Sequence, residues 1–81
     1  MPWRVIAHGD QVWHVDAVAE RPAHTVAWQL ALSFRAAADR PRGRAFWTIY
    51  PLEATSKTSL FMQAERIPNT ALSDLLAERL A

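Results

Sequence analysis

The chain contains no cysteine among its 81 residues. It can therefore form neither disulfide bonds nor a thiolate nucleophile, and it lacks the usual ligands of a structural zinc site. Only two glycines are present, Gly9 and Gly43, so we do not expect a glycine-rich loop that binds phosphate through its backbone N–H groups. Nucleophile-elbow and metalloprotease motifs are also missing from the sequence. These absences predict a protein that is not an enzyme and that holds no cofactor or metal.

Long hydrophobic runs are missing too. No segment approaches the ~20 apolar residues of a membrane-spanning helix. The first residues reach a charge at Arg4 before any apolar stretch long enough for a signal peptide. We therefore predict a cytoplasmic protein with no membrane partner.

Basic residues are concentrated in one short segment. The net charge is only +1, but residues 35–44 hold four of the nine basic residues and one of the eight acidic ones. This segment carries +3, which leaves −2 for the rest of the chain. The distribution indicates a mildly acidic body with one basic loop.

The apolar composition is sufficient for one small core. Hydrophobic residues make up 51% of the chain and include four Trp, three Phe and one Tyr. A chain of this length buries about two thirds of the surface it exposes when unfolded, so its margin of stability is small. We predict a single domain over residues 1–81.

The first two apolar segments, Trp3–Ala7 and Val12–Ala19, flank the sequence HGDQ, which is a hairpin signal. A two-residue loop at the Gly-Asp pair would place Arg4 opposite Val15 and mix polar with apolar residues on both faces. A loop of three or five residues instead pairs Arg4 with Asp16. It also gathers six apolar residues on one face, namely Trp3, Val5, Ala7, Trp13, Val15 and Ala17. Because a slip of one residue exchanges the faces, we predict the odd-numbered loop.

Two further strands are predicted from period-two alternation. In TVAWQLALSF the large apolar residues fall on every second position, namely Val26, Trp28, Leu30, Leu32 and Phe34. The segment RAFWTIY, which ends before Pro51, is rich in aromatic and β-branched residues. Either Phe46 or Trp47 faces away from the core. If Trp47 and Ile49 face the core, Phe46 and Tyr50 lie on the opposite face. Each strand then supplies one Trp to the core.

Two short helices are predicted at the C-terminus. In the first, one face at helical spacing carries Leu60, Phe61, Ala64 and Ile67. A strand there would place Phe61 and Ile67 beside Gln63 and Glu65, which is a poorer pattern. In the second helix, which Asn69 or Thr70 can cap, the apolar stripe is Leu72, Leu75, Leu76 and Leu80. The predicted fold is α+β: a four-stranded antiparallel meander followed by two short C-terminal helices packed on one sheet face.

The uncovered sheet face is the first candidate functional surface. It is too apolar for ordinary solvent surface and too polar for a second core. We expect the contact to involve Ile6, Val12, Val18, Ala27, Gln29 and Ala31. A second copy of the chain is the expected partner, and the face or an edge strand makes the contact. Scattered apolar residues are also common on small proteins without a partner. The leading prediction is a non-catalytic, self-associating interaction module.

The basic loop supports an alternative function. Guanidinium groups bind phosphate and carboxylate, and aromatic rings on an open sheet stack nucleic-acid bases. We therefore consider a binder of single-stranded nucleic acid or of another polyanion, such as an acidic protein, that uses Arg35, Arg40, Arg42, Arg44, Phe46 and Tyr50. Hairpin loops are often polar without binding anything, and the basic surface typical of nucleic-acid binders is missing.

The histidines give a third, formal alternative. In the predicted hairpin register His8 and His14 share one face with Asp16, which would suit a metal site or a small hydrolase. A lone histidine on a strand is more often structural or solvated. We therefore predict no metal site here.

Overall fold

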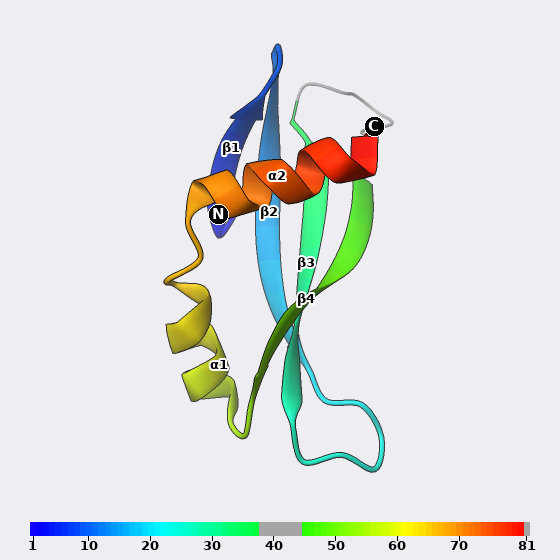
Figure 1. The fold of residues 1–81 in the computed structure, drawn as a ribbon, viewed down its shortest axis with the longest axis vertical. Coiled ribbons are helices and arrows are strands. Elements are labelled where there is room, and N and C mark those ends of the chain that lie inside the picture. The colour runs from blue at the N-terminus through cyan, green and yellow to red at the C-terminus, as the bar shows by residue number, and fades with distance from the viewer. Residues whose placement is uncertain (38–44, 81) are drawn as a thin grey trace.

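In the first part of the chain apolar and polar side chains alternate as in strands, and in the last part the apolar side chains recur at helical spacing. The computed structural model describes residues 1–37 and 45–80. Within them lie four strands and two helices, with bounds β1 (Arg4–His8), β2 (Gln11–Glu20), β3 (Trp28–Ala36), β4 (Ala45–Ala54), α1 (Lys57–Ala64) and α2 (Asn69–Leu80). The strands form one antiparallel sheet in the order β1-β2-β3-β4, and the helices follow it (Figure 1). The predicted α+β fold is confirmed.

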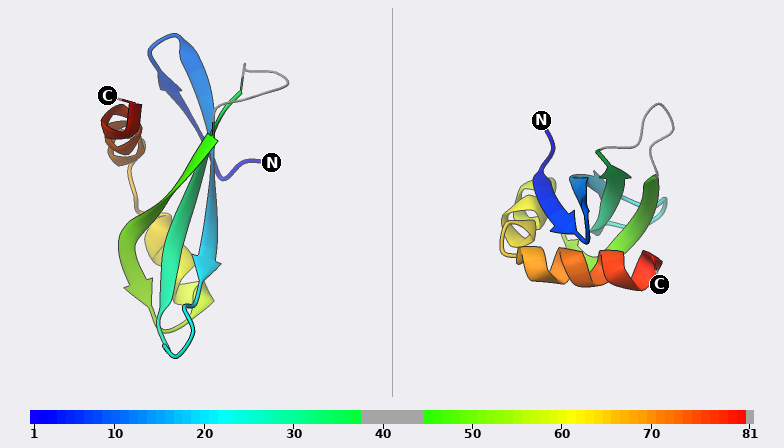
Figure 2. Two further views of the ribbon diagram at one scale, coloured as in Figure 1. Left: turned by 90° about the vertical axis from the view of Figure 1, so that its right-hand side faces the viewer. Right: turned by 90° about the horizontal axis from the view of Figure 1, so that it is seen from above.

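The core lies between the sheet and the two helices. Its strand members are Ile6, Trp13, Val15, Leu30, Leu32, Phe34 and Ala36, and its helical members include Leu60, Ala64, Leu72 and Leu76. We call this side of the sheet the covered face and the other side the open face. Figure 2 shows α2 lying across one side of the twisted sheet.

The extended conformation predicted for residues 26–34 is confirmed for β3. Leu30, Leu32 and Phe34 are fully buried on the covered face, whereas Val26 lies before the strand and is 80% exposed. Full burial of each such side chain contributes about 1.5–3 kcal/mol. Because β3 has a neighbour on both sides and helices above it, it forms the centre of the core.

The loop predicted between β1 and β2 was wrong. Arg4 pairs with Val15 and His8 pairs with Gln11, so the connection is the two-residue loop Gly9-Asp10. Gly9 has φ of 61°, whereas φ at Asp10 is not positive. A positive φ at the first loop residue alone is the signature of a type II′ turn, whose twist matches the flanking strands.

Arg4 explains why this register is stable although it places a charge on the covered face. Its Nη1 donates to the Ile67 carbonyl at 2.7 Å and to Asn69 Oδ1 at 2.8 Å, and its Nη2 donates to the Glu65 carbonyl at 3.1 Å. The guanidinium carbon also lies 4.3 Å from the Trp3 ring centroid. One side chain thus satisfies carbonyls at the end of α1 and in the α1–α2 connection. The same register gives Ile6 a place in the core, opposite Trp13.

For β4, the alternative that placed Trp47 and Ile49 in the core was wrong. Phe46 pairs with Phe34 and stacks on it, with ring centroids 4.9 Å apart and planes 9° apart. Tyr50 packs against the core on the same side. Trp47 and Ile49 lie on the open face and are 58% and 52% exposed. Both sets of side chains in β4 are large and apolar, so alternation alone could not decide between the faces.

A bulge interrupts the pairing of β3 with β4. Leu30 pairs with Tyr50, but its neighbour Gln29 pairs with Glu53, so Pro51 and Leu52 are extra residues in β4. Proline has no backbone N–H to give to a ladder, and bulges on edge strands are where it is tolerated. The two extra residues bend β4 without exchanging its faces.

The predicted C-terminal helices are confirmed, with the first one shifted. Ser56 caps α1 by accepting a hydrogen bond from the Ser59 backbone N–H at 3.1 Å. The helix ends at Ala64, so Ile67 lies in the connection, although it remains buried in the core. Phe61, expected on the apolar stripe, is exposed. In α2, Leu72 and Leu76 are buried, Leu75 is partly buried and Leu80 is exposed.

Gly9→Ala tests the turn. An added Cβ at Gly9 would meet nothing within 4 Å, so the cost comes from the backbone conformation alone. We expect a loss of about 1–3 kcal/mol in the free energy of unfolding, measured by urea denaturation at fixed protein concentration. The control is Asp10→Ala in the same turn, which should lower the free energy of unfolding much less. Equal effects of the two changes would contradict the type II′ assignment.

Arg4→Met tests the connection between the first strand and the helices. Methionine keeps much of the apolar stem but loses the three hydrogen bonds, so we expect about 1.5–3 kcal/mol of destabilisation in the same measurement. The control is Arg66→Met, an exposed position in the same connection, which should change stability by no more than about 0.5 kcal/mol. If Arg4→Met left the free energy of unfolding unchanged, the guanidinium would not be what holds the first strand to the helices.

Candidate interaction surface

The open face carries exposed apolar side chains from three of the four strands. Because residues alternate between faces, the register places Val5, Val12, Val18, Trp47 and Ile49 on this side, and each of them is exposed. Trp47 and Ile49 are neighbours on β4. Apolar groups of this size gathered on one face are a candidate contact surface.

The predicted interface residues divide between the two faces. Val12 and Val18 lie exposed on the open face, and Gln29 lies there partly buried. Ala31, paired between Val18 and Ile49, faces the same way but is fully buried, because its single methyl does not reach past its larger neighbours.

Two of the predicted positions fall elsewhere. Ile6 was wrongly placed on the open face, since it is 4% exposed in the core under the helices. Ala27 lies before β3, outside the strand. Sequence reasoning missed Val5 and Ile49, which it had placed toward the core, and left the choice between Phe46 and Trp47 open. The correct pairing of β1 and of β4 would have identified both residues and decided that choice.

The aromatic residues predicted to bind nucleic-acid bases lie apart from Arg35. Arg35 is exposed on the open face, opposite His14, whereas Phe46 and Tyr50 pack on the covered face. The predicted grouping of these three side chains on one surface was therefore wrong. Arg40, Arg42 and Arg44 lie outside the described residues.

The histidine and aspartate candidates are separated as well. His8 follows Ile6 on the covered side of β1, while His14 and Asp16 lie on the open side of β2. Asp16 Oδ1 accepts a hydrogen bond from the Trp3 backbone N–H at 3.3 Å, so this carboxylate has a structural partner. No group of three or more potential metal ligands occurs within residues 1–37 and 45–80.

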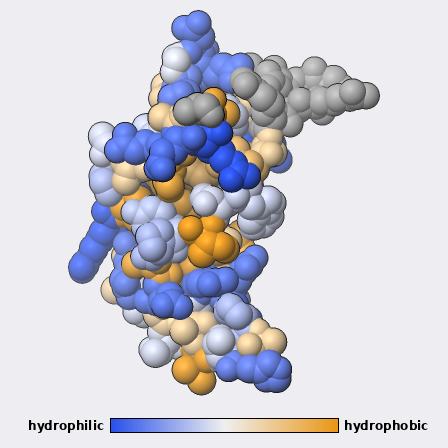
Figure 3. Space-filling view, turned by 45° about the vertical axis from the view of Figure 1, so that its right-hand side comes forward, coloured by the Kyte–Doolittle hydropathy of each residue, from blue (hydrophilic) through white to orange (hydrophobic). Residues whose placement is uncertain are grey.

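Among residues 1–37 and 45–80 the sheet ends at β4, and no strand of this part of the chain pairs with the outer side of β4. The left view of Figure 2 shows β4 at the front of the sheet, and Figure 3 shows hydrophobic surface among hydrophilic groups on this side of the molecule. From Ala45 to Tyr50 the strand reads AFWTIY, with no charge and no proline. Native edge strands are usually protected by charges, prolines or bulges. Here such protection begins only at Pro51.

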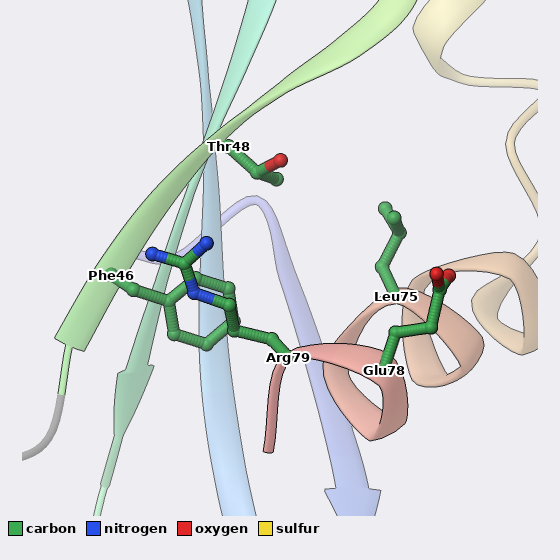
Figure 4. Close-up of a pocket in the computed structure, with 5 residues that line it drawn as sticks. All are labelled: Phe46, Thr48, Leu75, Glu78 and Arg79. Atoms are coloured by element: carbon green, nitrogen blue, oxygen red, sulfur yellow. The ribbon is translucent and has the colours of Figure 1, made fainter. Parts of the chain in front are cut away.

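A shallow groove runs beside this edge on the covered face. Its volume is about 260 Å³, and it is lined by Phe46, Thr48, Leu75, Glu78 and Arg79 (Figure 4). The Arg79 guanidinium carbon lies 5.1 Å from the Phe46 ring centroid. The groove thus joins an aromatic surface on β4 to charged groups on the last turn of α2.

No helix in the described part of the chain is long and apolar enough to cross a membrane. Comparison of the chain with protein-family models, with curated proteins and with solved structures found no match.

Proposed function

We propose that this protein is a non-catalytic interaction module of the cytoplasm that associates with a second copy of itself through the β4 edge. The observation that carries the proposal is the uncharged, proline-free edge from Ala45 to Tyr50, with exposed Trp47 and Ile49 beside it. Such an edge presents unpaired backbone groups, and a second strand would complete its hydrogen bonds.

The chemistry around the edge favours a copy of the same chain as partner. Both signs of charge occur near the edge: Arg35 pairs with Ala45 of β4, and Glu78 and Arg79 lie beside β4 on the covered side. A contact between identical surfaces needs such a balance, because a surface of one sign would repel its copy.

Ile49→Lys tests this function, with Val5→Lys as its matched control. Both residues are 52% exposed on the open face, but Ile49 lies on β4 and Val5 on the opposite edge strand, β1. We expect the unchanged protein and Val5→Lys to be dimers by size-exclusion chromatography with light scattering. Ile49→Lys should be a folded monomer at the same concentration, since a lysine on an edge strand opposes pairing.

Two results would contradict the proposal. The first is an unchanged protein that is monomeric at its highest soluble concentration. The second is dissociation by Val5→Lys with no effect of Ile49→Lys, which would move the contact to the other edge. Circular dichroism of each variant would show that a monomer is not simply unfolded.

Single-stranded nucleic acid is the second candidate partner, and one observation favours it. Trp47 is 58% exposed, and its pairing with Ser33 places it diagonally from Arg35 on the open face. An exposed ring beside a guanidinium can stack a base while neutralising a phosphate. In this version Trp47 replaces Phe46 and Tyr50 as the aromatic residue that stacks a base. It would act together with the predicted arginines of the basic loop.

Fluorescence anisotropy with labelled single-stranded DNA and RNA separates the two functions. The self-association proposal predicts unchanged anisotropy at low salt. Binding that weakens steeply as salt rises and is reduced in Trp47→Ala, but not in Val5→Ala, would instead establish the nucleic-acid function.

A further inference from the structure

We propose that two copies pair their β4 strands antiparallel about a two-fold axis at Thr48, and that Tyr50 of each copy completes the groove between β4 and α2 of the other. This inference rests on the self-association proposed above and specifies its register. It also assigns an occupant to the groove.

The residues of the edge match one another about Thr48. A two-fold axis there sets Thr48 against its own copy, Trp47 against Ile49 of the second copy, and Phe46 against Tyr50 of the second copy. Threonine pairs, aromatic pairs and pairs of an aromatic with a β-branched residue are all favourable across antiparallel strands. The pairing also buries the exposed Trp47 and Ile49 on the open face.

Neighbouring registers match less well. An axis at Trp47 would set Phe46 against Thr48 and Ile49 against the small Ala45. An axis at Ile49 would set Trp47 against Pro51, which has no backbone N–H to donate. With the axis at Thr48, Pro51 meets Ala45 at the end of the pair, where the bulge already ends the regular ladder. The central register is therefore the one in which every large side chain of the edge meets another.

The groove lies where the second copy's Tyr50 would arrive. Phe46 forms part of the groove, and its cross-strand partner in this register is that Tyr50. The incoming ring would lie beside Phe46 and within reach of the Arg79 guanidinium, which already lies over the Phe46 ring. A cation over an aromatic ring is stabilising, and burial strengthens the interaction.

The two helices contact β4 at different places. The last turn of α2 meets β4 at Phe46, while α1 packs on β4 as well. The two-fold axis reverses the direction of the second β4, so the α2 ends of the two copies lie at opposite ends of the pair. Each α2 end then faces the Tyr50 segment of the other copy.

Single cysteines in this cysteine-free chain test the register. Residues opposite each other on antiparallel strands have Cβ atoms about 4.5–5.5 Å apart, close to disulfide distance. We expect Thr48→Cys to form a covalent dimer under mild oxidation. Trp47→Cys and Ile49→Cys should each stay largely uncrosslinked alone, but an equimolar mixture of the two should form a covalent heterodimer.

Arg79→Gln tests the groove, with Arg66→Gln, an exposed arginine outside it, as control. By sedimentation equilibrium we expect the dimer dissociation constant to rise about threefold or more for Arg79→Gln, as loss of a cation–π contact implies. Arg66→Gln should leave the dissociation constant unchanged.

The outcomes separate the register from the function. A dimer that crosslinks through Trp47→Cys alone or Ile49→Cys alone would overturn the Thr48 register while leaving self-association through β4 intact. Crosslinking at Thr48→Cys with no effect of Arg79→Gln would overturn the role of the groove. A monomeric protein that crosslinks at none of these positions would overturn both the inference and the proposed function.

Discussion

The contact of Arg4 with the connection between the two helices is the constraint on which the arrangement of this protein depends. It ties the first strand to residues more than sixty positions away, and it does so through backbone carbonyls as well as the Asn69 side chain. A charged side chain on the covered face would ordinarily be costly, but here its hydrogen bonds replace those that water would make. Because Arg4 points toward the helices, Val5 must point away from them.

That choice of face extends across the sheet. In this register Arg4 pairs with Val15, and the alternation along β2 puts Trp13 and Val15 under the helices and leaves His14 and Asp16 outside. The pairing of β2 with β3 and of β3 with β4 continues this alternation, so Phe46 lies on the covered face and Trp47 on the open face. The exposed apolar side chains of the open face thus follow from two pairings: the hairpin register exposes Val5, and the pairing of β3 with β4 exposes Trp47 and Ile49.

The two edges of the sheet differ in length and chemistry. β1 has five residues, includes Arg4 and ends in a tight turn. β4 has ten residues, and its first six carry neither charge nor proline. The covered face is filled by both helices, but beside the start of β4 it retains a groove into which a side chain could fit. These features together make β4 the edge best suited to pair with another strand.

The sequence by itself determined the element types, including the extended conformation of β3 and the two C-terminal helices. Their periodicities are local, and Leu30, Leu32 and Phe34 admit only one conformation that gathers them on a single face. Only the tertiary structure decided which face of β1 and of β4 is covered. In β4 both faces are apolar, so Phe46 and Trp47 are equivalent candidates until pairing with β3 selects one. In β1 the deciding interaction is made by Arg4 with the far end of the chain, and no local pattern contains it. A contact between distant residues thus decided the register of β1. In that register each side chain of β1 faces the side opposite to the one that sequence patterning predicted.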